Sequence, residues 1–369
     1  MKLENTYREI ANSLKNLDKF EGIRSVGWES PSNIALVKYW GKRDVQLPQN
    51  PSLSFALNNS FTETVVQYSF ENSNIIDLEL FFENKKNEAF ENRIQNYFEQ
   101  IAIYLPFVKM LKFKIESKNS FPHSAGIASS ASAMSALALC LVTVENDYFG
   151  TLKEEKDFFE KASFLARLGS GSAARSVYGN YSVWGKSQYV SDSSDGIAIS
   201  YDKNIDPEFL ALGDAILITS SETKKVSSSM GHNLMTNHPY AESRYKQANE
   251  NLGELLKALQ SNDEQLFIDV VENEALSLHA LMMSSNNGYS LLNQNTWEII
   301  QKIRKFRKDN NTFATFTLDA GPNVHLIYKL KDKLKIDELI EKELIEHCEN
   351  EKWIDDKMGI GPDKILEKW

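Results

Sequence analysis

A loop of small residues directly before an apolar helix limits what this chain can fold into more than any other feature. The loop lies in "FPHSAGIASSASAMSALALC" at 121–140, where Gly, Ala and Ser fill most positions before an alanine-rich run begins. Such side chains add little to a core, but they let another group approach the backbone, and the N–H groups of a helix N-terminus attract anions. The loop predicts a phosphate site, although a tight helix–sheet contact would need the same small residues.

Three further loops carry charged residues among small ones. "ARLGSGSAARS" at 166–176 places Arg175 beside Gly and Ser, and a guanidinium offers a planar fork of donors to a carboxylate or phosphate. "SPSNIALVKYWGKRDVQLPQNPSLSFAL" at 30–57 clusters Lys38 and Lys42 around two aromatic residues. "FTLDAGPNVHL" at 316–326 ends a strand-like run with Asp319 before a turn, where a catalytic base would be held rigidly. Taken singly, each loop would also be explained as a solvated or structural feature.

Composition narrows the class of protein. The chain has 369 residues, enough for two domains, and a net charge of −10, which argues against a nonspecific grip on nucleic acid or anionic membrane. The two cysteines form no motif, and Cys140 is expected to be a buried hydrophobe. No apolar run reaches ~18 residues, and the charged N-terminus lacks the apolar stretch of a signal peptide. A cytoplasmic enzyme or binding protein is therefore expected, with its cations gathered where a small anion binds.

Hydrophobic periodicity predicts an irregular alternation of strands and helices, which favours an α+β fold with antiparallel sheets. The polar stretch "YDKNIDPEF" at 201–209 is the expected domain boundary. The expected helices are 4–20, 88–105, 129–146, 154–168, 239–259, 263–283 and 290–307, and the expected strands are 61–70, 75–82, 111–119, 179–186, 197–200, 214–219, 312–320 and 324–330.

The loops together resemble the diphosphomevalonate decarboxylase family of the GHMP kinase superfamily. The matching stretches follow the family's order from residue 30 onward: "NIALVKYWGKRD" (33–44), "FPHSAGIASSAS" (121–132), "GSGSAARS" (169–176), "KKVSSSMGH" (224–232) and "TLDAGPN" (317–323). The resemblance implies a GHMP kinase fold, with an N-terminal domain like ribosomal protein S5 domain 2 and a ferredoxin-like C-terminal α/β sandwich. We expect an N-terminal extension at 1–22, a first domain at 23–204 and a second at 205–369.

The resemblance also implies a reaction. ATP, with Mg²⁺, would phosphorylate the 3-hydroxyl of mevalonate 5-diphosphate, and loss of phosphate and CO₂ would give isopentenyl diphosphate. Asp319 would orient the hydroxyl and take its proton late, as phosphoryl transfer proceeds. Lys38 would shape the charge of that aspartate, and Arg175 would hold the substrate carboxylate. Relatives are commonly homodimers, so a homodimer is expected too, with no nucleic acid or membrane partner.

The remaining site residues are also carried over from the resemblance. The substrate set is Asn33, Tyr39, Trp40, Gly41, Lys42, Arg93, Ser170, Gly171, Ser172 and Ser229. The ATP set is Ser124, Gly126, Ala128, Ser129, Ser130 and Ser132, with Ser130 as the magnesium ligand. Three alternatives stay open: a decarboxylase acting on the monophosphate, a kinase that phosphorylates without decarboxylating, and a noncatalytic ligand sensor of the same fold.

Overall fold

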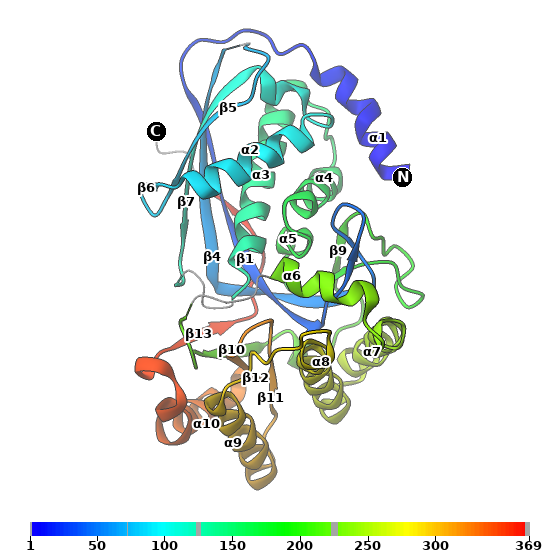
Figure 1. Ribbon diagram of the computed structural model, residues 1–369, viewed down its shortest axis with the longest axis vertical. Coiled ribbons are helices and arrows are strands. Elements are labelled where there is room, and N and C mark those ends of the chain that lie inside the picture. The colour runs from blue at the N-terminus through cyan, green and yellow to red at the C-terminus, as the bar shows by residue number, and fades with distance from the viewer. Residues whose placement is uncertain (1, 72, 123–126, 223–227, 366–369) are drawn as a thin grey trace.

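Two sheets, one formed mostly before residue 204 and one after it, organise the chain. The computed structural model describes residues 2–71, 73–122, 127–222 and 228–365. The larger sheet stands in the upper half of the molecule and the smaller one lies in the lower half (Figure 1). Among the described helices, none is both long and apolar enough to cross a lipid bilayer. The mixed architecture confirms the α+β class expected from the sequence.

The larger sheet is built on two long antiparallel strands, β1 (Arg24–Val37) and β4 (Ser52–Phe70). The second half of β4 pairs with β7 (Leu111–Asn119) and its first residues pair with β8 (Tyr181–Trp184), which in turn pairs with β9 (Ala198–Tyr201). The expectation of antiparallel sheets holds only in part at 75–82, because β5 (Asp77–Phe82) pairs antiparallel with β6 (Lys85–Lys86) but runs parallel to β7. The helix α2 (Glu88–Ile101) lies between β5 and β7 in the chain and supplies the crossover that a parallel pair needs.

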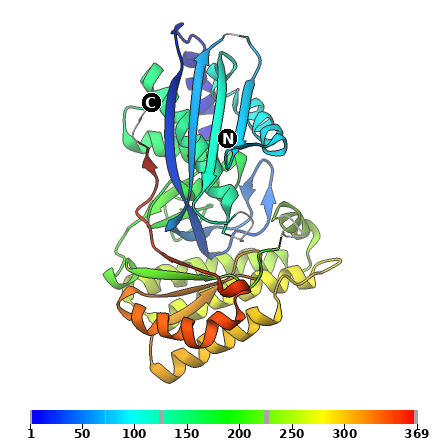
Figure 2. The ribbon, with the colours of Figure 1, turned by 90° about the vertical axis from the view of Figure 1, so that its left-hand side faces the viewer.

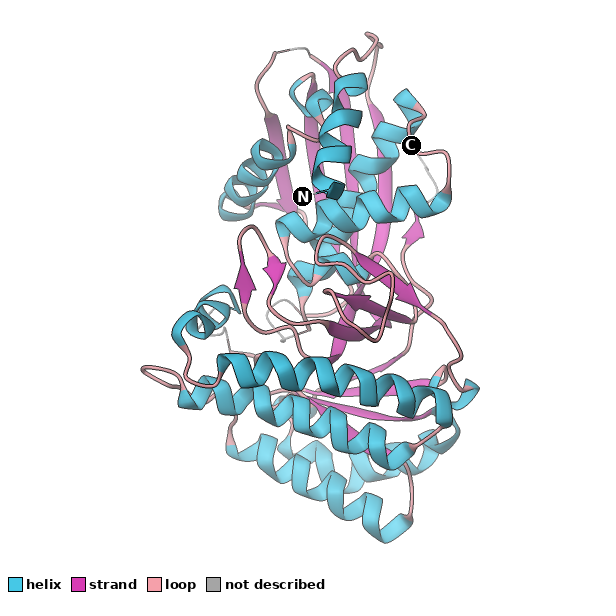
Figure 3. Cartoon of the chain, turned by 90° about the vertical axis from the view of Figure 1, so that its right-hand side faces the viewer, coloured by secondary structure: helices cyan, strands magenta, loops and turns pink. Residues whose placement is uncertain are grey.

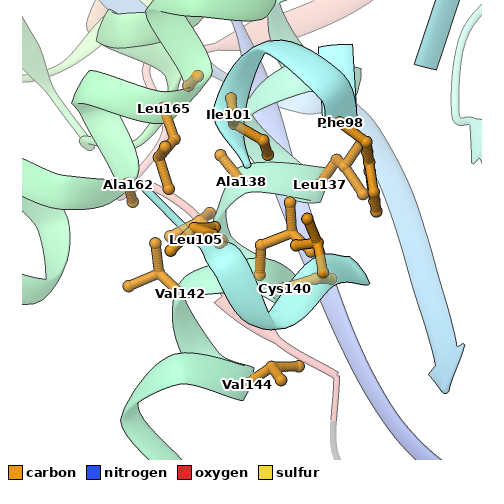
Figure 4. Packing of buried hydrophobic residues seen from close by; sticks show 14 of the residues in the cluster. Phe98, Ile101, Leu105, Leu137, Ala138, Cys140, Val142, Val144, Ala162 and Leu165 are labelled. Carbon is orange, nitrogen blue, oxygen red and sulfur yellow. The ribbon is translucent and has the colours of Figure 1, made fainter. Parts of the chain in front are cut away.

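The helix that follows the small-residue loop is the centre of the upper core. In α3 (Ser129–Phe149) nearly every residue from Ala131 to Glu145 is buried, because α3 lies between the sheet on one side and α4 (Glu155–Gly169) and α5 (Ala173–Ser176) on the other. Figure 4 shows α3 residues such as Leu137 and Cys140 packed against apolar side chains of its neighbours. Cys140 is fully buried, as predicted.

The smaller sheet has the strand order β11-β12-β10-β13, all antiparallel. In chain order this is 2-3-1-4, the arrangement of a ferredoxin-like sandwich, and it confirms the expected class of the C-terminal half. In the view of Figure 3 the long helices α7 and α8 run side by side in front of the sheet. The elements are β10 (Leu212–Leu217), α7 (Ala241–Ser261), α8 (Glu264–Ser284), α9 (Gln294–Asn310), β11 (Ala314–Thr317), β12 (Val324–Lys329), α10 (Lys333–Leu339) and β13 (Trp353–Lys357).

The first and last described segments of the chain both pack against the upper half of the molecule. The expected helix at 4–20 is shorter: α1 (Lys2–Ile10) passes into a 3₁₀ turn that ends at Leu14, and Tyr7 packs its ring 4.9 Å from that of Phe164. At the other end, β14 (Asp363–Lys364) pairs with β1, so the last described segment returns to the larger sheet and adds a strand at its edge (Figure 2). The division at 204/205 remains a prediction, but the final strand lies in the first sheet.

Candidate active site

A buried lysine and a partly exposed aspartate meet where the two halves of the chain touch. Lys38 follows the last residue of β1, and Asp319 follows β11 in the turn before β12. Lys38 Nζ donates to Asp319 Oδ1 at 3.0 Å; the lysine side chain is 2% exposed and the aspartate side chain 26%. Burial lowers the pKa of Lys38, and the carboxylates of Asp319 and Glu274 oppose that effect. The Lys38 ammonium group is thus shielded from solvent, whereas the Asp319 carboxylate that pairs with it is open to the cleft.

Arg175 lies in the short helix α5 (Ala173–Ser176), with its guanidinium oriented by two hydrogen bonds. Its Nε donates to Asn33 Oδ1 at 3.2 Å, and its Nη1 donates to Ser52 Oγ at 2.5 Å. Asn33 is fixed in turn, because its Nδ2 donates to Ser176 Oγ at 2.8 Å. Burial lowers the pKa of Arg175 to about 10, so the group keeps its charge at neutral pH.

The aromatic residues after Lys38 form one wall. Tyr39 lies with its ring centroid 4.7 Å from that of Trp184, and its buried hydroxyl has no hydrogen-bond partner among the described residues. A Cβ at Gly171 would lie 2.9 Å from that hydroxyl oxygen, so glycine is needed for the close approach. An unpartnered buried hydroxyl is costly unless a ligand satisfies it. The Tyr39 hydroxyl therefore fits a site that receives a polar ligand.

His232, from α6 (Ser228–Asn233), completes this wall. Its ring centroid lies 4.3 Å from that of Tyr39 and 4.7 Å from that of Trp40, and its Nδ1 accepts from the Gly41 N–H at 3.0 Å. Burial, with a smaller contribution from Lys42, lowers the pKa of His232 to about 3. The neutral ring accepts at Nδ1, so its proton is on Nε2.

These residues line one cleft of about 280 Å³. Its charged lining residues are four cations, Lys38, Lys42, Arg93 and Arg175, and one carboxylate, Asp319, in a chain whose net charge is −10. Concentrating cations in a concave, partly buried site raises the local positive potential and attracts anions. The cleft is built for a small, highly charged anion. Eight further residues of the expected substrate and ATP sets also line it: Asn33, Tyr39, Trp40, Ser170, Gly171, Ser172, Ala128 and Ser130.

The serine loop meets the cleft at the start of α3. Ala128 adopts a left-handed conformation with φ of 48°, which turns the chain into the helix, and Ser130 Oγ lies 3.3 Å from Ser170 Oγ at the cleft. Ser132 faces the other way: its hydroxyl is buried 2.6 Å from Thr62 Oγ1 of β4, so the structure does not place it among the ligand-facing groups.

A second hollow, of about 250 Å³, opens on the other side of the same loop. It is mainly apolar, with side chains from β5, β7, α2 and α3, and it shares only Arg93 and Ser130 with the charged cleft. Arg93 is exposed, and its Nη2 donates to the Gly169 carbonyl oxygen at 3.4 Å. Ser129 lines this apolar hollow rather than the charged cleft.

Three predicted residues have no described side chain. Ser124 and Gly126 lie outside the described residues, and for Ser229 only the backbone, in α6, is described. Gly41 contributes its N–H to His232 rather than lining the cleft.

Sequence reasoning missed several residues of the site. His232 ends the matched stretch at 224–232 but was not singled out, and Arg244 and Glu274, which bind the backbone of Lys38, occur at ordinary polar positions of two helices. His279, whose Nε2 lies 3.1 Å from the Asp319 carbonyl oxygen, also lies on α8. The motif was the signal that could have identified His232; Arg244, Glu274 and His279 carry no local signal, because their roles depend on contacts with residues at least 40 positions away.

Family models match both halves of the chain. Residues 30–195 match the diphosphomevalonate decarboxylase-like N-terminal domain, and residues 215–364 match the mevalonate 5-diphosphate decarboxylase C-terminal domain. Among curated proteins, the chain is 30% identical over 318 residues to the diphosphomevalonate decarboxylase of Gibberella zeae, covering 82% of this chain and 80% of that protein. It is 29% identical over 333 residues to the human enzyme of that name, covering 84% and 78%.

Solved structures agree. The mevalonate diphosphate decarboxylase of Staphylococcus aureus superposes with a TM-score of 0.78 at 29% identity, over 93% of this chain and 98% of that one. A structure of MDDEF in complex with MVAPP, AMPPCP and magnesium gives 0.77 at 25% identity, over 93% and 99%. The same fold, the same two domain models and relatives of matching length lead to one conclusion: the chain belongs to the diphosphomevalonate decarboxylase family.

Proposed function

We propose that this chain converts ATP and (R)-mevalonate 5-diphosphate to isopentenyl diphosphate, ADP, phosphate and CO₂, a step of isoprenoid biosynthesis by the mevalonate pathway. The observation that carries the proposal is the buried Lys38–Asp319 pair at 3.0 Å, open to a cleft with a surplus of cations, in a member of this family. A site that only binds a phosphorylated ligand would not need a buried lysine held against a lone carboxylate.

Asp319 is the group that orients the substrate's 3-hydroxyl and receives its proton as the γ-phosphoryl of ATP is transferred. Lys38 donates a hydrogen bond to that carboxylate and offsets negative charge at the transferring phosphoryl, where positioned cations contribute most. When the new phosphate departs, the electron pair of the breaking C–C bond to the carboxylate forms the alkene and CO₂ leaves. Asp319 and Lys38 thus serve the phosphoryl transfer to the 3-hydroxyl.

Arg175 serves the second half. Its guanidinium is oriented through Asn33 and Ser52, and a fixed planar fork matches the geometry of a carboxylate. Holding the substrate carboxylate in place keeps the scissile C–C bond aligned with the departing phosphate. Ser170, Gly171 and Ser172 line the cleft beside it and complete this end of the site.

The 5-diphosphate would bind to Tyr39, Lys42 and Arg93, which line the cleft. Ser229 is assigned to the same group from the family motif alone. The unpartnered Tyr39 hydroxyl is the observation that favours a phosphate oxygen here. Trp40 and Gly41 both contact His232, which packs against the Tyr39 ring and fixes its position.

ATP fits across the serine loop. Its phosphates would lie at the N-terminus of α3, near Ala128, Ser129 and Ser130, and its base in the apolar hollow between α2, α3 and the sheet. The described residues include no cluster of three or more His, Cys, Asp or Glu that would bind a metal by itself. This suits Mg²⁺, which keeps water and phosphate oxygens as most of its ligands, with Ser130 as the protein hydroxyl. Bound there, Mg²⁺ would neutralise charge on the phosphates.

The direct test is ATP-dependent release of CO₂ from carboxyl-labelled mevalonate 5-diphosphate, with ADP measured in parallel. Equal amounts of ADP and CO₂ are expected. ADP without CO₂ would identify a 3-kinase, and binding without either product would identify a ligand sensor.

A second test separates the diphosphate from the monophosphate. A lost charge-assisted hydrogen bond is worth ~1.5–3 kcal/mol, about tenfold or more in an equilibrium constant. The parent enzyme should prefer mevalonate 5-diphosphate in a competition assay, and Lys42→Ala should reduce that preference about tenfold. Equal use of both substrates by the parent would favour the monophosphate decarboxylase.

We further propose that the enzyme works in the cytoplasm as a homodimer, on the strength of the family resemblance. Sedimentation equilibrium of the purified chain and fractionation of cells would measure the two properties.

A further inference from the structure

The backbone of Lys38 is held by residues from the second half of the chain. Lys38 comes one residue after β1 ends, so its peptide groups lie beyond the ladder with β4. Its N–H donates to Glu274 Oε2 at 2.8 Å, and its carbonyl oxygen accepts from Arg244 Nη2 at 3.2 Å. Asn50 Nδ2 donates to the same carbonyl oxygen at 2.9 Å. Both polar groups of this one residue are thus fixed by side chains.

The two residues from the second half form a buried ion pair of their own. Arg244, on α7, donates from Nη1 to Glu274 Oε1 at 2.6 Å and from Nη2 to Glu274 Oε2 at 2.5 Å, while Asn251 Nδ2 donates to Oε1 at 2.6 Å. Arg244 and Glu274 are both buried. Such a bidentate pair is geometrically rigid, so it fixes the Lys38 N–H and carbonyl groups that are hydrogen-bonded to it.

Charge reinforces the geometry. The charged groups that face Lys38 are Asp319 from the turn after β11, Glu274 from α8, Arg244 from α7 and Arg175 from α5. Burial and Arg175 lower the pKa of Lys38, whereas Asp319 and Glu274 raise it. Glu274 therefore helps to keep the buried ammonium charged, in addition to bonding its backbone.

We propose that Arg244 and Glu274 are positioning residues for catalysis, which fix the main chain of Lys38 so that its ammonium meets Asp319 in the cleft. Neither residue lines the cleft, so they act through Lys38 and not on the substrate. The inference rests on the proposed function for its catalytic readout. It also assigns α7 and α8, which carry none of the family motifs quoted above, a direct part in assembling the site.

The chain offers a matched control. Glu145 and Lys161 form another fully buried ion pair, at 2.6 Å between α3 and α4, and neither lines the cleft. Replacing a buried pair by apolar residues of similar volume is often neutral for stability. The double variants E274L/R244M and E145L/K161M therefore remove one buried pair each and should both fold. At saturating substrate, kcat of the first should fall about 100-fold with KM within a few-fold, because misplacing a reacting group by ~1 Å costs that much; the second should keep the parent kcat.

A single variant tests the charge. Glu274→Gln keeps the shape and an acceptor for the Lys38 N–H but removes the negative charge, so the Lys38 ammonium is less stabilised. The basic limb of the kcat–pH profile should move to lower pH, and in Glu145→Gln it should stay in place. The pH dependence of acylation of Lys38 by acetic anhydride, followed by mass spectrometry of the whole enzyme, should shift in the same direction. That second readout holds whatever reaction the enzyme catalyses, so failure of the positioning role is separable from failure of the proposed function.

Equal kcat for the two double variants, or an unmoved basic limb and acylation profile in Glu274→Gln, would overturn the positioning role. If the Glu274 variants failed to fold while the Glu145 variants folded, the pair would be a structural element of the domain contact, and the proposal would equally be rejected.

Discussion

Two buried lysine–carboxylate pairs in this molecule have the same chemistry and different surroundings. Lys161 and Glu145 lie 2.6 Å apart with both side chains fully buried, whereas Lys38 and Asp319 lie 3.0 Å apart with the aspartate 26% exposed. In the first pair Glu145 Oε1 accepts from Lys161 Nζ at 2.6 Å and from Thr151 Oγ1 at 2.7 Å, and neither charged side chain is exposed. In the second, the carboxylate is shared between the lysine and the cleft. The two pairs thus differ in whether the carboxylate is open to a ligand, and this difference supports the catalytic role proposed for Asp319.

The pairs also differ in what brings them together. Glu145 and Lys161 are 16 residues apart, on two helices packed against each other. Lys38 and Asp319 are 281 residues apart and meet only because the two halves of the chain are packed together. The geometry of the proposed catalytic pair therefore depends on the contact between the two halves.

The largest effect is expected at the open pair. Asp319→Asn keeps the shape and removes the charge, so kcat should fall by ~10⁴-fold, the upper range for an acid–base group, while substrate affinity changes little. CO₂ release and calorimetric titration with mevalonate 5-diphosphate measure the two quantities. Near-normal CO₂ release would remove Asp319 from the reaction.

At the closed pair the same kind of change should act on stability instead. Lys161→Met leaves Glu145 buried without its cation, which costs about 3–5 kcal/mol of unfolding free energy. Denaturant titration measures this loss, and kcat per folded molecule should equal that of the parent. A fall in kcat with unchanged stability would contradict the assignment of this pair as structural.

A third variant keeps the positive charge at position 175 in the cleft but loses the planar guanidinium. Arg175→Lys retains the cation but loses the planar fork oriented by Asn33 and Ser52. We expect kcat to fall ~100-fold and ATP affinity to stay within a few-fold, by single-turnover kinetics and ATP titration. Weakened ATP affinity alone would move Arg175 to the nucleotide end of the site.

The last prediction tests whether solvent reaches the ring of His232 in the wall of the cleft. Because the pKa of His232 is lowered to about 3 in the folded protein, the unfolded chain binds a proton at this residue below pH ~6.5 that the folded chain does not. Folding stability should therefore fall as pH falls from ~6.5 toward 3, by up to ~1.4 kcal/mol per unit. His232→Gln should flatten this dependence in denaturant titrations at pH 4.5 and 7, and an unchanged slope would mean that the ring is solvated.

Much of the site could be predicted from the sequence because its residues occur in short stretches with a local purpose. Small residues before an apolar run mark a helix N-terminus, and the loops of Lys38, Arg175 and Asp319 could be matched to family motifs without knowing any distance. The length predicts two domains, and hydrophobic periodicity predicts the α+β class. The alanine-rich apolar run likewise predicts a helix, and all but one of the residues from Ala131 to Glu145 in α3 are buried.

The tertiary structure decided what depends on packing between distant segments. Ser132 belongs to the serine loop by sequence, yet the turn of α3 points it at β4. The strand at 75–82 alternates like an antiparallel one, yet the α2 crossover makes it parallel to β7. Arg244 and Glu274 read as ordinary helix residues until their ion pair is seen on the Lys38 backbone. Sequence patterns record which face of an element is apolar and which residues share a loop. The partner of a side chain hundreds of residues away is set only when the two sheets and their helices pack together.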